Sequence, residues 1–147
     1  MVDEVMFRKV ICEVVRRFEG LSRTQLVKVV YLIDREYYME EGEALTGVHY
    51  KLSFWGPTSH AFRDVMEGMV DEGILFEWFD GEKYHILMNK DMECEDNDEK
   101  LVEVINSALE GIVNEGELMS PKNLVRHVFS LEEVKDSEFL STIKFKR

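Results

Sequence analysis

Cysteine, proline and long apolar runs are scarce in this sequence. Its 147 residues include two cysteines, Cys12 and Cys94, and two prolines. The cysteines form no C-x-x-C pair and no zinc-ligand spacing, so we expect two ordinary thiols and neither zinc nor thioredoxin-like chemistry. No apolar run approaches the ~20 residues that span a bilayer, and acids stand where a signal peptide would be basic. We therefore expect a cytoplasmic protein with no membrane partner.

Motifs of known enzyme chemistry are also missing. The four histidines have no spacing typical of a metal centre; they are His49, His60, His85 and His127. The sequence contains no G-x-S-x-G, phosphate-binding glycine loop or dinucleotide fingerprint. We therefore expect no metal, no cofactor and no enzyme activity. The alternative is an enzyme with a small-molecule pocket around Lys28, Tyr31 and His60.

Positive charge is in short supply as well. The chain has 18 lysines and arginines against 30 aspartates and glutamates, which gives a formal net charge of −12. Nucleic-acid affinity depends on neutralising phosphates, and no long basic stripe is present to do this. We therefore do not expect nucleic acid as a partner. A basic protein fits the negative charge better, because opposite charges steer association.

The hydrophobic pattern is typical of one mostly helical domain spanning residues 1–147. We expect a core over about 1–90, an acidic connector over 91–99 and C-terminal helices over 100–147. The connector carries six carboxylates in nine residues. It lacks the glycine and the spacing of an EF-hand loop, so we expect a solvated linker rather than a calcium site.

Helices are predicted from apolar periodicity and from their end signals. The predicted ranges are 7–18, 23–41, 101–113 and 121–129, with a further helix from a cap at Thr58 or Ser59 to about Gly73. We leave open whether the tail after residue 129 packs on this chain or on another. Formation of a homo-oligomer is left open too.

Residues 23–41 should form the buried central helix. Between residues 26 and 33 apolar side chains point in almost every direction, and Lys28 is the single charge. Ser22 and Gln25 have the spacing of a capping box at the start, and Gly42 is a suitable residue for the end.

Two β segments are predicted around the third helix. Alternating apolar residues over 48–54 indicate a half-buried strand that closes in a Gly56-Pro57 turn. Residues 74–79 and 82–87 flank Asp80-Gly81, which is a strong hairpin signal. The predicted fold class is therefore α+β, mostly α, with a small antiparallel hairpin and a winged-helix-like order.

A winged-helix order raises a transcriptional regulator as an alternative function. The helix that would enter the DNA groove carries four acids, which are Asp64, Glu67, Asp71 and Glu72. Acids at these positions would repel phosphate. We therefore keep this alternative behind a protein-binding function.

Half of the sixteen aromatic residues fall between Tyr50 and Tyr84. We expect six of these eight in the core. We expect Tyr50 and Trp78 at the surface, because exposed aromatic side chains on a sheet are good interface anchors.

The segment Leu26 to Leu32, followed by Phe54-Trp55-Gly56-Pro57, resembles the Panacea domain, also called the SocA-like antitoxin family. Lys28 and Tyr31 match the family's helix motif, and Gly56 and Pro57 match its tyrosine-glycine-proline motif, with Trp55 in place of the tyrosine. The resemblance covers roughly residues 20 to 90.

This resemblance implies an antitoxin that binds a partner protein, a toxin, and neutralises it or delivers it to a protease. The candidate partner-binding residues are Lys28, Tyr31, Tyr50, Trp55, Gly56, Pro57 and Trp78. A purely structural role is the alternative for the four residues that match the motifs. Tyr31 would then be a core residue, Lys28 would extend from a buried helix, and Gly56-Pro57 would set the third helix.

Overall fold

The structure is a computed structural model that describes residues 1–92, 94 and 98–147. Its elements are α1 (Glu4–Arg17), α2 (Arg23–Glu41), β1 (Lys51–Ser53), β2 (Gly56–Thr58), α3 (His60–Asp71), β3 (Leu75–Phe79), β4 (Tyr84–Met88), α4 (Glu99–Leu109), β5 (Val113–Asn114), β6 (Glu117–Leu118), α5 (Pro121–Phe129) and α6 (Glu132–Lys135). The strands form three antiparallel pairs. The predicted class, α+β and mostly α, is confirmed, while the winged-helix likeness stays a prediction.

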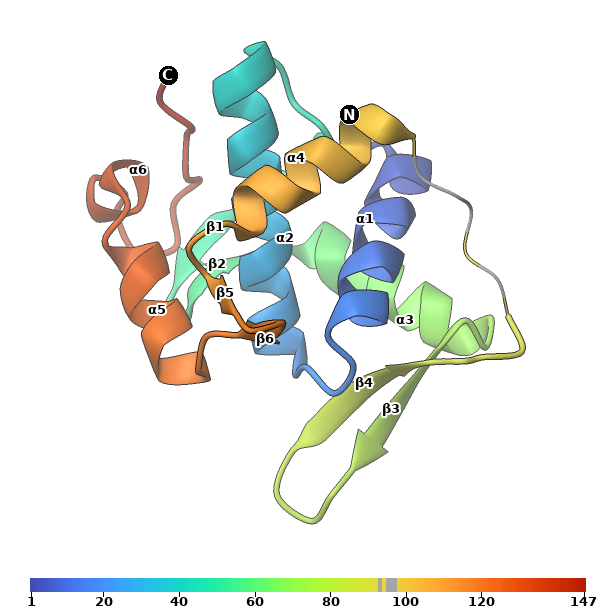
Figure 1. The fold of residues 1–147 in the computed structure, drawn as a ribbon. Helices are drawn as coiled ribbons and strands as arrows, with labels where there is room; N and C mark the ends of the chain where they lie inside the picture. The colour runs from blue at the N-terminus through green and yellow to red at the C-terminus, as the bar shows by residue number, and fades with distance from the viewer. Residues whose placement is uncertain (93, 95–97) are drawn as a thin grey trace.

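Helix α2 is the centre of the fold, with α1, α4 and α5 packed around it (Figure 1). All residues from Leu26 to Asp34 are buried, as the all-round apolar pattern predicts. Ser22 and Gln25 form the predicted capping box, and Gly42 ends the helix in the left-handed conformation with φ 74°. None of the described helices is both long and apolar enough to cross a membrane.

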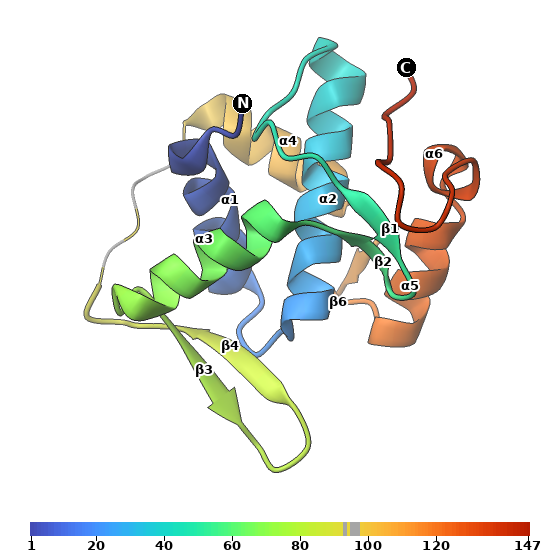
Figure 2. The same ribbon diagram turned by 180° about the vertical axis from the view of Figure 1, so that it is seen from behind.

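Helix α1 runs antiparallel to α2 and contributes one wall of the core (Figure 1). Its fully buried side chains include Phe7, Ile11 and Val14. The Phe7 ring meets Phe62 of α3 edge-on, with 6.2 Å between ring centroids. Helix α3 therefore lies against α1 (Figure 2), and Ser59 caps it as predicted.

The prediction for residues 48–57 is wrong in two respects. The strand β1 is shorter than the predicted 48–54, and Gly56-Pro57 belongs to the paired strand β2. Pro57 is tolerated because the residue opposite it, Leu52, makes its backbone hydrogen bonds with the C-terminal tail. The Leu52 N–H donates to Ser141 O at 3.1 Å, and the Leu52 C=O accepts from Leu140 N at 2.8 Å. Leu52 therefore has no backbone group left that would need the N–H that proline lacks.

The β3–β4 hairpin is confirmed, with Asp80-Gly81 in its turn. It projects from the helical body in both views (Figures 1 and 2). Its base is attached to the α1–α2 link, where Leu21 and Ile86 form an isolated antiparallel bridge.

The C-terminal half departs from the predicted helix over 101–113. Helix α4 ends at Leu109, and Gly111 then takes a φ of 85° that the helix cannot accommodate. The short hairpin β5–β6 follows. Helix α5 begins at Pro121, as predicted, and Ser120 is its cap.

The tail packs on this chain. Ile143 is buried, and its N–H donates to Tyr50 O at 2.8 Å. The Phe145 ring lies 5.4 Å from both Tyr31 and Tyr38, measured between centroids. Arg147 donates to the last carbonyl groups of α2, where cations are favoured.

The prediction of two ordinary thiols is wrong, because Cys12 and Cys94 form a disulfide. The bridge joins α1 to the segment that follows β4. A sequence separation of 82 gives no local spacing signal, so the pairing could be seen only in the fold.

The predictions for the acidic connector over 91–99 fall partly on residues 93 and 95–97, which lie outside the described residues. At its end, the connector leads into α4. Asp98 caps α4 by accepting from Leu101 N at 2.7 Å.

Candidate protein-binding surface

Six of the eight aromatic residues between Tyr50 and Tyr84 are exposed, which reverses the prediction that six would be buried. The exposed ones are Phe54, Trp55, Phe76, Trp78, Phe79 and Tyr84. Trp78 is 57% exposed, as predicted, whereas Tyr50 is 1% exposed and its predicted surface position is wrong. We name Phe76, Trp78, Phe79 and Tyr84 the hairpin aromatics, and Phe54 and Trp55 the turn aromatics.

The hairpin aromatics are exposed because the hairpin extends beyond the body that could cover it (Figure 2). Leu75 and Ile86 point inward at its base and are fully buried. Phe76 and Trp78 alternate with the inward side chains and therefore face the other way. Phe79 and Tyr84 pair near the tip with 4.9 Å between ring centroids.

An ion pair holds the base of the hairpin to the start of α2. The Arg23 guanidinium donates from Nε to Glu77 Oε2 at 2.9 Å and from Nη2 to Glu77 Oε1 at 2.5 Å. This bidentate bond raises the pKa of Arg23 and fixes the strand's orientation.

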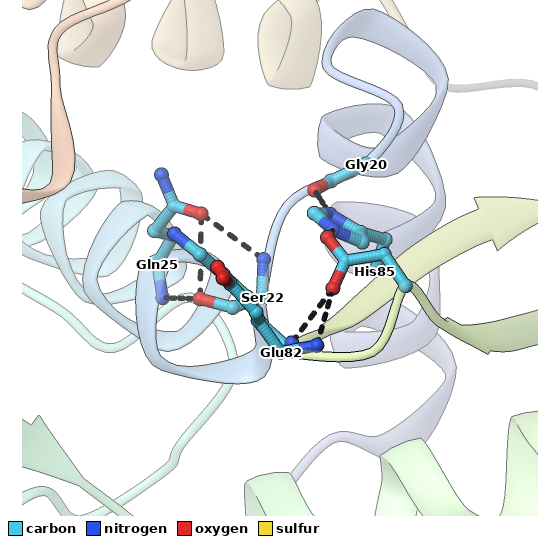
Figure 3. A network of polar contacts seen from close by, with 7 residues as sticks. Gly20, Ser22, Gln25, Glu82 and His85 are labelled. Carbon is cyan, nitrogen blue, oxygen red and sulfur yellow. Dashed lines mark hydrogen bonds and ion pairs between the residues drawn. The ribbon is translucent and has the colours of Figure 1, made fainter.

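A second clamp, centred on His85, joins the hairpin turn to the α1–α2 link (Figure 3). His85 Nδ1 lies 2.7 Å from Gly20 O, and Nε2 lies 2.6 Å from Asp80 Oδ2. Both partners are acceptors, so an imidazolium satisfies both and a neutral ring only one. The bond to Asp80 and the Gly20 carbonyl accordingly raise the pKa of His85.

Asp80 also organises the turn that it opens. Its Oδ1 accepts from the N–H of Glu82 at 2.8 Å and of Lys83 at 2.9 Å (Figure 3). These backbone donors and His85 lower the pKa of Asp80. The aromatic hairpin is therefore held at its base and at its turn.

The turn aromatics lie on the β1–β2 turn. Phe54 is 81% exposed and Trp55 68% exposed. The Phe54 ring rests against Phe139 of the tail, with 4.9 Å between centroids. Phe139 is itself about half exposed, so the tail extends this aromatic patch.

A pocket of about 190 Å³ lies beside Trp55. We name it the Lys28 pocket, and its lining consists of Arg23, Thr24, Val27, Lys28, Ser53, Trp55, Pro57, Thr58, Ser59, Phe62 and Arg63. The fold thus gathers Lys28, Trp55 and Pro57, with Gly56 adjoining, although the two motifs are separated along the chain. Trp78 does not line this pocket.

Lys28 is only 2% exposed. Its Nζ donates to Thr24 O at 3.1 Å, and burial lowers its pKa to about 8. Its Cε lies 3.3 Å from the position that a Cβ on Gly56 would occupy. Gly56 also has a φ of 112°, so backbone conformation and this close approach both favour glycine there.

Tyr31 and Tyr50 belong to the core and present no surface to a partner. Their rings meet edge-on with 5.0 Å between centroids. The Tyr31 hydroxyl donates to Glu133 at 3.2 Å, and the Tyr50 hydroxyl donates to Asp34. Burial raises the pKa of both phenols.

Several residues of these surfaces were missed in the sequence. Phe54, Phe76, Phe79 and Tyr84 were assigned to the core because period-two alternation does not reveal whether a second layer covers a strand. Arg63 lines the Lys28 pocket through tertiary contacts that leave no local signal. Across residues 1–92, 94 and 98–147, no group of three or more histidine, cysteine or acidic side chains is arranged to hold a metal ion.

Comparisons of the chain with protein-family models, with curated proteins and with solved structures find no match. The resemblance to the Panacea domain therefore stays a prediction. What bears on function is the geometry of the two aromatic clusters and of the Lys28 pocket.

Proposed function

We propose that this chain is a protein-binding module of the antitoxin type. It would recognise a basic partner protein and neutralise it or deliver it to a protease. The observation that carries the proposal is the set of four hairpin aromatics, each at least half exposed on a clamped hairpin.

Exposed aromatic side chains on such a support are suited to protein recognition. Phe76 and Trp78 share one face of the hairpin, and Phe79 and Tyr84 lie on the other face near its tip. Clustered apolar surface is uncommon on proteins that do not use it for binding. Tryptophan and tyrosine are enriched among the residues that dominate binding energy. The Arg23–Glu77 bond and the His85 clamp restrict the hairpin before binding, so less conformational entropy is lost when the complex forms.

The charge of the chain supports a basic partner. The net charge is −12, although the hairpin turn itself is nearly balanced, because Asp80 pairs with His85 and the exposed Glu82 adjoins the exposed Lys83. Acids around an apolar centre would steer a cationic surface onto it and add specificity.

Cytoplasmic localisation is part of the proposal. There the Cys12–Cys94 bridge would be exposed to a reducing pool of thiols. The bridge lies in α1 and after β4, so its reduction would leave the contacts of the hairpin base and turn in place.

Affinity capture from the source cells tests the proposal when three forms of the chain are compared. The wild type should recover one basic protein, and Trp78→Ser should recover much less of it. Val5→Ser is the matched control, because Val5 is also exposed, at 59%, but lies on α1. Co-expression of the recovered protein should inhibit growth unless the wild-type chain is present. Equal recovery by all three forms, or a partner without toxicity, would contradict the proposal.

A further inference from the structure

We propose that the Lys28 pocket is a binding site for a dianionic phosphate group, either free or as a monoester. This inference goes beyond the proposed function and concerns a different surface from the hairpin aromatics. It rests on the positive charge of the pocket, on the burial of Lys28 and on the two helix ends that border it.

Among the residues that the structure describes, three cations and no carboxylate line the pocket. Arg23 is already engaged by Glu77 and lies 3.8 Å from Glu67. Within the part of the chain that the structure describes, the Arg63 guanidinium has no hydrogen bond or ion pair and Lys28 has no acidic partner. Arg63 is exposed and water can solvate its charge, but Lys28 is 2% exposed, so its charge is the one that needs compensation.

Of the two cations, Lys28 gives stronger support to the proposal than Arg63. A buried ammonium group loses hydration and normally has a counter-ion or several acceptors. Here a single backbone carbonyl accepts from Nζ, so two of its three N–H groups have no protein acceptor within the described residues. An anion in the pocket would supply these acceptors.

Neutral donors complete the lining. Thr24 and Thr58 carry hydroxyl groups among the lining residues, whereas the Ser53 hydroxyl already donates to Gly56 O at 2.6 Å. The first turn of α2 contributes Arg23 and Thr24, and the first turn of α3 contributes Phe62 and Arg63. The positive ends of two helix dipoles therefore border the same cavity, where they favour an anion.

The charge count selects phosphate over a carboxylate. Lys28 and Arg63 together offer two positive charges, which a phosphate dianion balances and a monoanionic carboxylate does not. Arginine also binds phosphate oxygens in a bidentate manner. The exposed Trp55 ring at the rim could cover the remainder of a monoester.

Thermal unfolding of the whole chain with inorganic phosphate tests this site. Ionic strength is held constant with chloride while phosphate is titrated. We expect the unfolding temperature of the wild type to rise with saturation. Arg63→Gln, which alters an exposed residue and so preserves the fold, should weaken the fitted phosphate affinity about tenfold or more. Lys28→Met should abolish the response.

Lys144→Gln is the matched control, since it removes one exposed positive charge that does not line the pocket. It should respond to phosphate as the wild type does. Glucose 6-phosphate is a monoester and should reproduce the response if the site accepts a phosphate on a larger molecule. If the site accepts only the free ion, inorganic phosphate alone should raise the unfolding temperature. Either result supports the site. Equal responses in the wild type and Arg63→Gln would overturn it, as would an equal response to acetate.

Discussion

Asp34 is a buried carboxylate of the central helix α2. Its oxygens accept from the Thr46 hydroxyl at 2.7 Å and from the Tyr50 hydroxyl. These hydrogen bonds favour the charged form, but burial is the larger effect and raises the pKa of Asp34 to about 6. The folded chain therefore binds a proton more tightly than the unfolded chain, whose aspartates titrate near 3.8.

This shift predicts a pH dependence of stability that Asp34→Asn removes. Because the folded-state pKa is the higher one, the free energy of unfolding should fall as pH rises from about 4 to about 6, by about 3 kcal/mol. Urea unfolding at intervals across this range measures it. Asp64→Asn, a change of an exposed acid on α3, should retain the wild-type slope. If Asp34→Asn retained that slope too, the account of Asp34 would be wrong.

At the residue scale, the sequence singled out residues of interest better than it predicted whether each one is buried or exposed. The fold brings Lys28, Gly56 and Pro57 of the matched motifs into one neighbourhood, and their role in partner binding stays a prediction. Tyr31 and Tyr50 show what sequence alone could not decide. A tyrosine suits a surface anchor and a core residue equally well, and only the buried acceptors Glu133 and Asp34 explain why both are in the core.

Among the elements, the β3–β4 hairpin has the most direct bearing on the proposed function. Its orientation depends on His85, whose two ring nitrogens face Gly20 O and Asp80. The pKa of His85 is raised above 6.5. The stabilisation from this clamp is therefore complete below pH 6.5 and is lost as pH rises through the higher folded-state pKa.

We predict that Asp80→Asn lowers the pKa of His85, because Asn offers no charge to the imidazolium but retains an acceptor for the turn. Titration of the His85 ring resonances by NMR measures the change. Glu82→Gln removes the same charge from the same turn, and only the backbone N–H of Glu82 contacts Asp80. A decrease of equal size in both variants would mean that general charge, rather than the clamp, sets the pKa.

Elements with local signals were predicted well, and those that depend on distant contacts were not. Helix α2 has the predicted bounds because its capping box and terminal glycine act within a few residues. The β1–β2 pair was missed because the tail, through Ser141 and Leu140, takes the backbone bonds of Leu52. The Cys12–Cys94 bridge was missed for the same reason, since tertiary packing alone brings its two ends together.

On the scale of the whole molecule, an acidic chain presents aromatic side chains on a projecting hairpin and a cationic pocket beside α2. The two proposals thus concern separate surfaces. The pocket can be tested on the chain alone, so a failure of phosphate binding would leave the partner proposal standing. Loss of partner binding would likewise leave the pocket unaffected.

The most direct test of the central claim is the affinity of the captured partner for the purified chain, measured by calorimetry. We predict that Trp78→Ser weakens binding by about thirtyfold, as expected of a central aromatic anchor, while Val5→Ser changes it less than about twofold. Raising the salt concentration should weaken binding to the wild type, because charge attracts the basic partner. Equal affinities of Trp78→Ser and Val5→Ser, or binding indifferent to salt, would contradict recognition through an acidic, aromatic surface.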